Sequence, residues 1–178
     1  MQSHLILGLV IVVLGGILAA IIVYHILRYL RGSIKLSIPC TAFNPGDTIA
    51  GTFELLTKKE IQGNKLLVSL IGTKTVKTHH GGKTRTRTEE VYRDEVVIEG
   101  EKTYFAGYTA THAFQVKAPN QQAPDFLNSQ VGQILGAAIR LLGDPSSRIT
   151  WKIEVRLDAK GVDLATSRSV SIHQQQGF

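Results

Sequence analysis

A run of basic residues in the middle of the chain carries the side chains best suited to binding chemistry. Between Thr73 and Thr88 there is no acidic residue, and the run holds five cations and two histidines: Lys74, Lys77, His79, His80, Lys83, Arg85 and Arg87. Lysine and arginine bind phosphate and carboxylate groups, and arginine does so with two parallel hydrogen bonds. The run therefore predicts a site for an anionic membrane surface or for an acidic or phosphorylated segment of a protein partner.

The shape of this site is also predicted by the sequence. Threonine alternates with the cations on both sides of Gly81-Gly82, which is typical of two strands joined by a tight turn. We expect a hairpin that projects beyond the rest of the domain. An alternative interpretation is structural, because lysine and arginine on an exposed strand discourage pairing with other chains. Nucleic acid is not the expected partner, since no aromatic residue interrupts the run to stack on bases.

Metal binding and catalysis have little support. His79 and His80 are adjacent, so strand geometry would direct them to opposite faces, and no other ligand follows at a metal-binding spacing. The chain has no nucleophile elbow, no phosphate-binding glycine loop and no Cys-x-x-Cys pair. We expect no cofactor, no metal and no catalytic residue. His112, in phase with Phe114 and Val116, is expected to be a hydrogen-bonded or partly buried core residue.

Alternation of apolar and polar residues predicts the elements that position the basic run. The clearest case is Trp151–Asp158, where apolar and charged residues alternate strictly. Similar segments are separated by turn sequences such as Asn44-Pro45-Gly46-Asp47. Short strands with this spacing predict an all-β fold, an antiparallel, immunoglobulin-like β-sandwich. One segment, residues 126–142, has helical spacing instead and predicts a helix that caps the sandwich; the alternative is a helix in the membrane interface or in a partner's groove.

The first residues predict a membrane anchor. From Leu5 to Val23 the chain has no charged side chain, and about 20 apolar residues in a helix cross a hydrocarbon core of about 30 Å. We expect one transmembrane helix over about residues 5–27. The alternative, a cleaved signal peptide, would begin with basic residues, and Met1-Gln2-Ser3-His4 contains neither lysine nor arginine.

Residues at the end of the apolar run predict its orientation. Arg28 and Arg31 follow it, together with the interfacial aromatics Tyr24 and Tyr29. The positive-inside rule then places the N-terminus outside and the C-terminal domain in the cytoplasm. A lone Cys40, expected to be a small core residue, agrees with a reducing compartment.

Small residues within the anchor suggest a further hypothesis. Gly15 and Ala19, and likewise Gly16 and Ala20, are four positions apart, a spacing that lets two helices approach closely. Dimerisation through the anchor is one interpretation. The alternative is that glycine and alanine are simply common in transmembrane helices.

Composition limits the rest of the chain to one domain. The formal net charge is +6 and the pI is about 9.6, which suits a domain facing an anionic lipid leaflet. Without the anchor, roughly 145 residues remain, enough for a sizeable core. We assign residues 1–31 to the anchor and its basic flank, 33–173 to the sandwich and 174–178 to a polar tail.

Several motifs in this domain resemble the arrestin N-terminal domain. Asn44-Pro45-Gly46-Asp47-Thr48-Ile49-x-Gly51 is similar to the family's PGD-x-apolar-x-G signature. The later pieces follow in the family's order: Leu66-x-Val68-x-Leu70-x-Gly72, Phe114-x-Val116-x-Ala118-Pro119 with Pro124-Asp125-Phe126, and Ile149-Thr150-Trp151-Lys152-Ile153. Together they cover residues 33–173.

The resemblance implies a fold and a broad role. Arrestins have two such sandwiches and this sequence has one, a form that suits a membrane-anchored bacterial member of the family. The charged residues of the arrestin polar core cannot be placed here, and there is no Pro-Pro-x-Tyr motif. The implied function is a non-catalytic adaptor or scaffold. The alternative is an accessory subunit or a lipid or envelope enzyme of the membrane surface.

Overall fold

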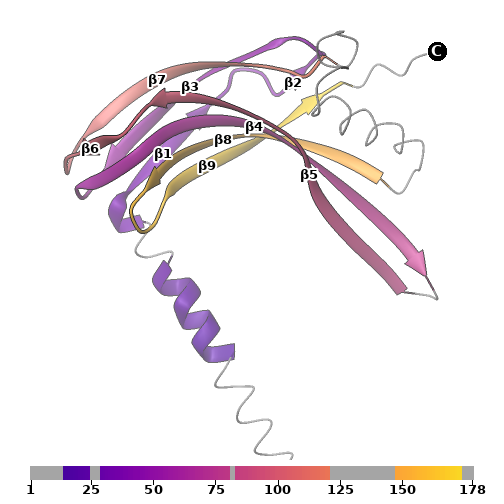
Figure 1. Ribbon diagram of the computed structural model, residues 1–178, viewed down its shortest axis with the longest axis horizontal. Helices are drawn as coiled ribbons and strands as arrows, with labels where there is room; N and C mark the ends of the chain where they lie inside the picture. The colour runs from indigo at the N-terminus through magenta and orange to yellow at the C-terminus, as the bar shows by residue number, and fades with distance from the viewer. Residues whose placement is uncertain (1–13, 25–28, 81–82, 121–146, 174–178) are drawn as a thin grey trace, which may run out of the picture.

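The computed structural model describes residues 14–24, 29–80, 83–120 and 147–173 (Figure 1). Residues 14–24 and 29–31 are helical, and the segment Leu14–Arg31 is long and apolar enough to cross a membrane. The start of the predicted anchor, the predicted helix at 126–142 and the polar tail lie outside the described residues.

Two β-sheets face each other in the remainder of the described chain, as the two layers in Figure 1 show. The smaller sheet has the strand order β1-β3-β7, with bounds Gly32–Ser37, Thr48–Thr57 and Thr109–Lys117. The larger sheet has the order β2-β9-β8-β4-β5, with β6 also paired to β4. Its bounds are Ala42–Phe43, Leu164–Ile172, Ser147–Ala159, Ile61–His80, Lys83–Glu99 and Lys102–Tyr104. The predicted sandwich is confirmed; its pairs are antiparallel except for β2 with β9, which run parallel.

The alternating patterns direct apolar side chains into the space between the sheets. Trp151, Ile153, Val155 and Leu157 of β8 are all buried there. Burying a large apolar side chain contributes roughly 1.5–3 kcal/mol, so these alternating positions account for much of the stability of the sandwich. Gly51 interrupts the pattern of β3 because a Cβ atom there would lie 2.7 Å from the Phe114 ring.

β4 is much longer than predicted. The alternation indicated a strand over Leu66–Leu70, but β4 is continuous for 20 residues. It lies between β5 and β8, so both of its edges are paired. Leu66 and Leu70 belong to the core between the sheets, and Leu67 and Ile71, outside that core cluster, are also buried. A central strand of this kind reads as an unbroken apolar run, and its ends are not marked by periodicity.

Cys40 is also placed differently from the prediction. Its thiol is exposed, not buried in the core. The residue follows the end of β1 and precedes β2, so the alternation of β1 does not extend to it.

Candidate functional site

The predicted basic hairpin is formed by β4 and β5. The two strands pair from Leu66 with Glu99 to His80 with Lys83. Among the described residues, β8 flanks β4 as far as the pair Val76 and Ser147. Beyond that point β4 and β5 continue as a two-stranded arm, which projects away from the two sheets in Figure 1. We call residues 76–87 the hairpin arm.

Strand register divides the predicted site between two faces. Directly paired positions of an antiparallel ladder share a face, and successive positions alternate. The pairs 80 with 83, 78 with 85 and 76 with 87 therefore belong to one face, which includes the positions of Lys83, Arg85 and Arg87. Lys77 and His79 occupy positions of the opposite face. The seven residues thus do not form one cluster.

The described residues of the predicted site differ in how far their side chains are exposed to solvent. Lys77 and Arg87 are exposed, and the Arg87 side chain is 81% exposed with the Glu89 carboxylate 3.9 Å away. Lys74 is only 7% exposed, so little of its side chain is accessible to a partner. The reason is that β8 still flanks β4 there, with Ile149 paired to Lys74. The side chains of His79, His80, Lys83 and Arg85 lie outside the described residues.

Ion pairs that alternation did not reveal cover the outer face of the large sheet. On β5, Arg93 binds Glu90 through two hydrogen bonds of 2.7 Å and reaches Glu95 at 3.2 Å. The hydrogen bonds from Arg93 lower the pKa of Glu90. On β8, Glu154 accepts hydrogen bonds of 2.8 Å from both Lys152 and Arg156.

The positive and negative charges on this outer face are paired with each other, which limits what the face can bind. Burial alone would raise the pKa of Glu154, but the bonds and charges of Lys152 and Arg156 outweigh it, so the pKa is lowered and the carboxylate stays ionised. Each arginine or lysine here already has a carboxylate partner within the sheet. The face is therefore less suited to an anionic partner than the hairpin arm.

A second polar cluster, formed by Glu99, Lys102 and Tyr104, lies near the start of β4. The Tyr104 hydroxyl, in a fully buried residue, donates to Glu99 at 2.7 Å, and Lys102 donates to the same carboxylate at 2.9 Å. Burial and the neighbouring Glu99 raise the pKa of Tyr104. These contacts tie β5, β6 and β4 together, and we assign the cluster a structural role.

His112 behaves as a partly buried core residue. It is partly buried and its ring stacks on Phe53, with 5.2 Å between ring centroids. Within the described ranges its Nε2 atom is buried without a hydrogen-bond partner, which differs from the hydrogen-bonded state given as one expectation. The described ranges also contain no group of three or more His, Cys, Asp or Glu residues able to hold a metal ion.

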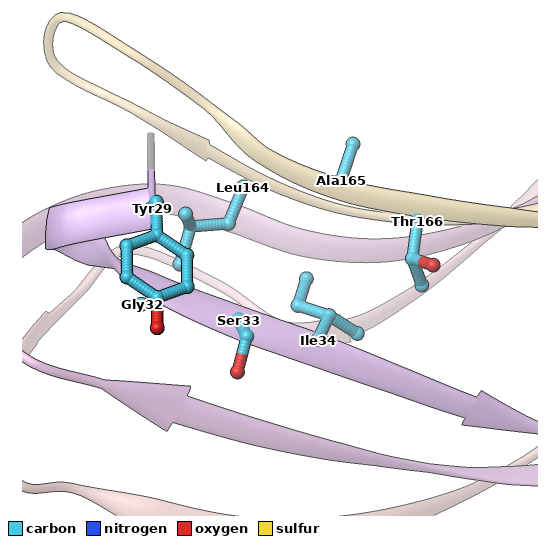
Figure 2. Close-up of a pocket in the computed structure, with 7 residues that line it drawn as sticks. All are labelled: Tyr29, Gly32, Ser33, Ile34, Leu164, Ala165 and Thr166. Atoms are coloured by element: carbon cyan, nitrogen blue, oxygen red, sulfur yellow. The ribbon is translucent and has the colours of Figure 1, made fainter. Parts of the chain in front are cut away.

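A pocket of about 410 Å³ lies between the edges of the two sheets, where the N-terminal helix joins the sandwich (Figure 2). Its lining is Tyr29, Gly32, Ser33, Ile34, Leu164, Ala165 and Thr166. In Figure 2, Ile34 of β1 and Thr166 of β9 point toward each other across the gap. This lining provides hydroxyl groups but no carboxylate, imidazole or amine, so it lacks the acid–base groups of a hydrolytic site.

Comparisons with known proteins support the fold. Neither a protein-family model nor a curated protein sequence matches this chain. Among solved structures, the chain is similar to Spo0M, a sporulation control protein from Bacillus subtilis, with a TM-score of 0.55 and 12% sequence identity. The match covers 82% of this chain and 50% of Spo0M, so the chain spans about half the length of that protein. At this identity the likeness shows the fold alone, the arrestin-type sandwich.

Proposed function

We propose that this protein is a membrane-anchored, arrestin-type adaptor that binds an acidic or phosphorylated segment of a protein partner through the hairpin arm. The observation that carries the proposal is the arm itself. It extends past the described part of β8, and cations without an intervening acid occupy its two strands from Lys77 to Arg87. No catalytic step is part of this function.

The position of the arm favours a protein partner over the lipid surface. The anchor joins the sandwich beside the start of β4, since the Lys58 N–H donates to the Arg31 carbonyl at 2.8 Å and β4 begins at Ile61. The arm lies at the other end of the same 20-residue strand. At about 3.3 Å per residue, that strand is about 60 Å long. The anchor and the arm are therefore attached at opposite ends of β4, so the anchor does not occupy the arm.

Flanking residues of the anchor support the orientation within the proposal. Tyr29 and Arg31 follow the apolar segment, as do Tyr24 and Arg28 in the sequence. A basic, aromatic flank of this kind is typical of the cytoplasmic end of a span. We therefore place the sandwich and the hairpin arm in the cytoplasm.

Peptide binding tests this function. We expect full-length protein in nanodiscs of zwitterionic lipid to bind a fluorescent, glutamate-rich peptide, measured by anisotropy, and to bind its phosphoserine counterpart at least as tightly. Binding should weaken as salt rises, because exposed charges are screened over about 8–10 Å. A lysine-rich peptide is the control.

Two results would argue against the proposal. If the affinity for the acidic peptide does not change between low and high salt, the arm does not bind the peptide through its charges. Failure of both acidic peptides to bind, while vesicles containing anionic lipid do bind the protein in a salt-dependent way, would favour the lipid surface as the partner of the arm.

A further inference from the structure

Exposed apolar side chains gather where the anchor meets the sandwich. Outside the helix at 14–24, the described residues expose four large hydrophobic side chains: Tyr29, Leu30, Val97 and Phe105. Tyr29 is 70% exposed and Phe105 is 68% exposed. Single exposed apolar residues are common on protein surfaces, but two exposed aromatics beside an apolar helix are a pattern of the membrane interface.

Backbone contacts show that Phe105 and the end of the anchor belong to one surface. Thr57 links them: its hydroxyl donates to the Phe105 carbonyl at 2.6 Å, and its carbonyl accepts from Gly107 at 2.7 Å. The next residue, Lys58, donates to the Arg31 carbonyl at 2.8 Å. The turn after β6 is thus held beside the segment that leaves the anchor.

Cations also lie at this end of the sandwich. The Lys58 ammonium lies 3.5 Å from the centre of the Tyr29 ring, and the Arg31 guanidinium donates to the Lys160 carbonyl at 2.9 Å. We call the surface formed by residues 29–31, 58–59, 105–107 and 160–161 the anchor-proximal end. Its cations are Arg31, Lys58, Lys59 and Lys160, and the acids nearby in the sequence are Glu60, Glu101 and Asp163. Lysine and arginine beside exposed aromatics suit anionic headgroups above an apolar layer.

We infer that the anchor-proximal end is a second membrane contact, in which Phe105 enters the headgroup layer and Lys58, Lys59 and Lys160 bind lipid phosphates. This inference rests on the membrane anchoring in the proposed function. A helix alone leaves a domain free to rotate and tilt. A second contact on the sandwich fixes its orientation, with β4 leading from the lipid surface toward the hairpin arm.

Fluorescence quenching in nanodiscs tests this contact with full-length protein. An environment-sensitive dye is attached to Phe105→Cys in a Cys40→Ser background, and nitroxide-labelled lipids quench dyes near the headgroups. The natural Cys40, exposed beyond the far end of β1, carries the dye in the control protein. Ala106→Cys, at the neighbouring exposed position of the same turn, is a second label should the first variant fold poorly.

We expect quenching at position 105 or 106 to exceed quenching at Cys40 by at least threefold. Replacing Lys58, Lys59 and Lys160 with glutamine should reduce that excess in anionic nanodiscs. Equal quenching at both ends in protein that co-floats with lipid would overturn the second contact and leave the anchor intact. Protein that does not co-float with lipid would overturn the anchor and this inference together.

Discussion

Replacing both Arg85 and Arg87 with glutamate is expected to lower the affinity of the full-length protein for a glutamate-rich peptide by roughly 100-fold or more. The strand register assigns both positions to one face of the hairpin arm. A hydrogen bond to a charged group contributes about 1.5–3 kcal/mol, and each 1.4 kcal/mol is a tenfold change in affinity. Two lost contacts with added repulsion account for the predicted magnitude.

Matched variants separate the hairpin arm from the charge of the whole protein. Lys117→Glu with Arg168→Glu makes the same change in net charge at exposed positions of β7 and β9. We expect that pair to change the affinity less than threefold. Lys77→Glu, on the opposite face of the arm, should have an intermediate effect. Equal losses in the arm variant and in the β7–β9 variant would show that net charge, and not the arm, determines binding.

Trp151→Ala is expected to lower the free energy of unfolding by about 3–5 kcal/mol, the range typical of removing a large core aromatic. The side chain is 5% exposed and lies on Gly72, where a Cβ atom would be 2.6 Å from its ring. Tyr92 meets the same ring edge to face, with 5.4 Å between centroids. Trp151 therefore packs against both β4 and β5 at the root of the hairpin arm, and alanine would leave a cavity there.

Denaturant unfolding followed by circular dichroism measures this loss, because Trp151 is the only tryptophan and its fluorescence disappears with the substitution. Thr150→Ala is the neighbouring control. Its hydroxyl is exposed and makes only a 3.4 Å hydrogen bond to the Thr73 carbonyl, so the cost should be below about 1 kcal/mol. A loss of less than about 1 kcal/mol for Trp151→Ala would mean that the ring does not support the hairpin root.

Alternating sequence patterns predicted the fold because, in each half-buried strand, the apolar residues mark the face that lies inside. Trp151, Ile153 and Val155 alternate with charged residues, and all three are buried as that pattern indicates. Gly51 is in phase with the core residues of β3, and the Phe114 ring fills the space that a side chain would need. The alternation within a strand depends on near neighbours in the chain, so the sequence alone displays it.

The parts that were missed depend on residues far apart in the chain. Lys74 and Lys77 look alike in the sequence, but Lys74 lies where β8 pairs with β4 and is buried, whereas Lys77 lies beyond the last pair at Val76 and is exposed. No residue of β4 indicates where its pairing with β8 stops. The grouping of Phe105 with Lys58 has the same origin. Hydrogen bonds of Thr57 hold the turn after β6 beside the segment that leaves the N-terminal helix, although Thr57 and Phe105 are about fifty residues apart in the sequence.

Amide hydrogen exchange of full-length protein in zwitterionic nanodiscs, with and without the glutamate-rich peptide, tests the proposed adaptor function most directly. We predict that peptide binding slows exchange over residues 74–89 and leaves the edges of β1 and β9 unchanged. Slower exchange along β1 and β9 with no change over 74–89 would contradict the account, because the partner would then occupy the gap between the two sheets and not the hairpin arm.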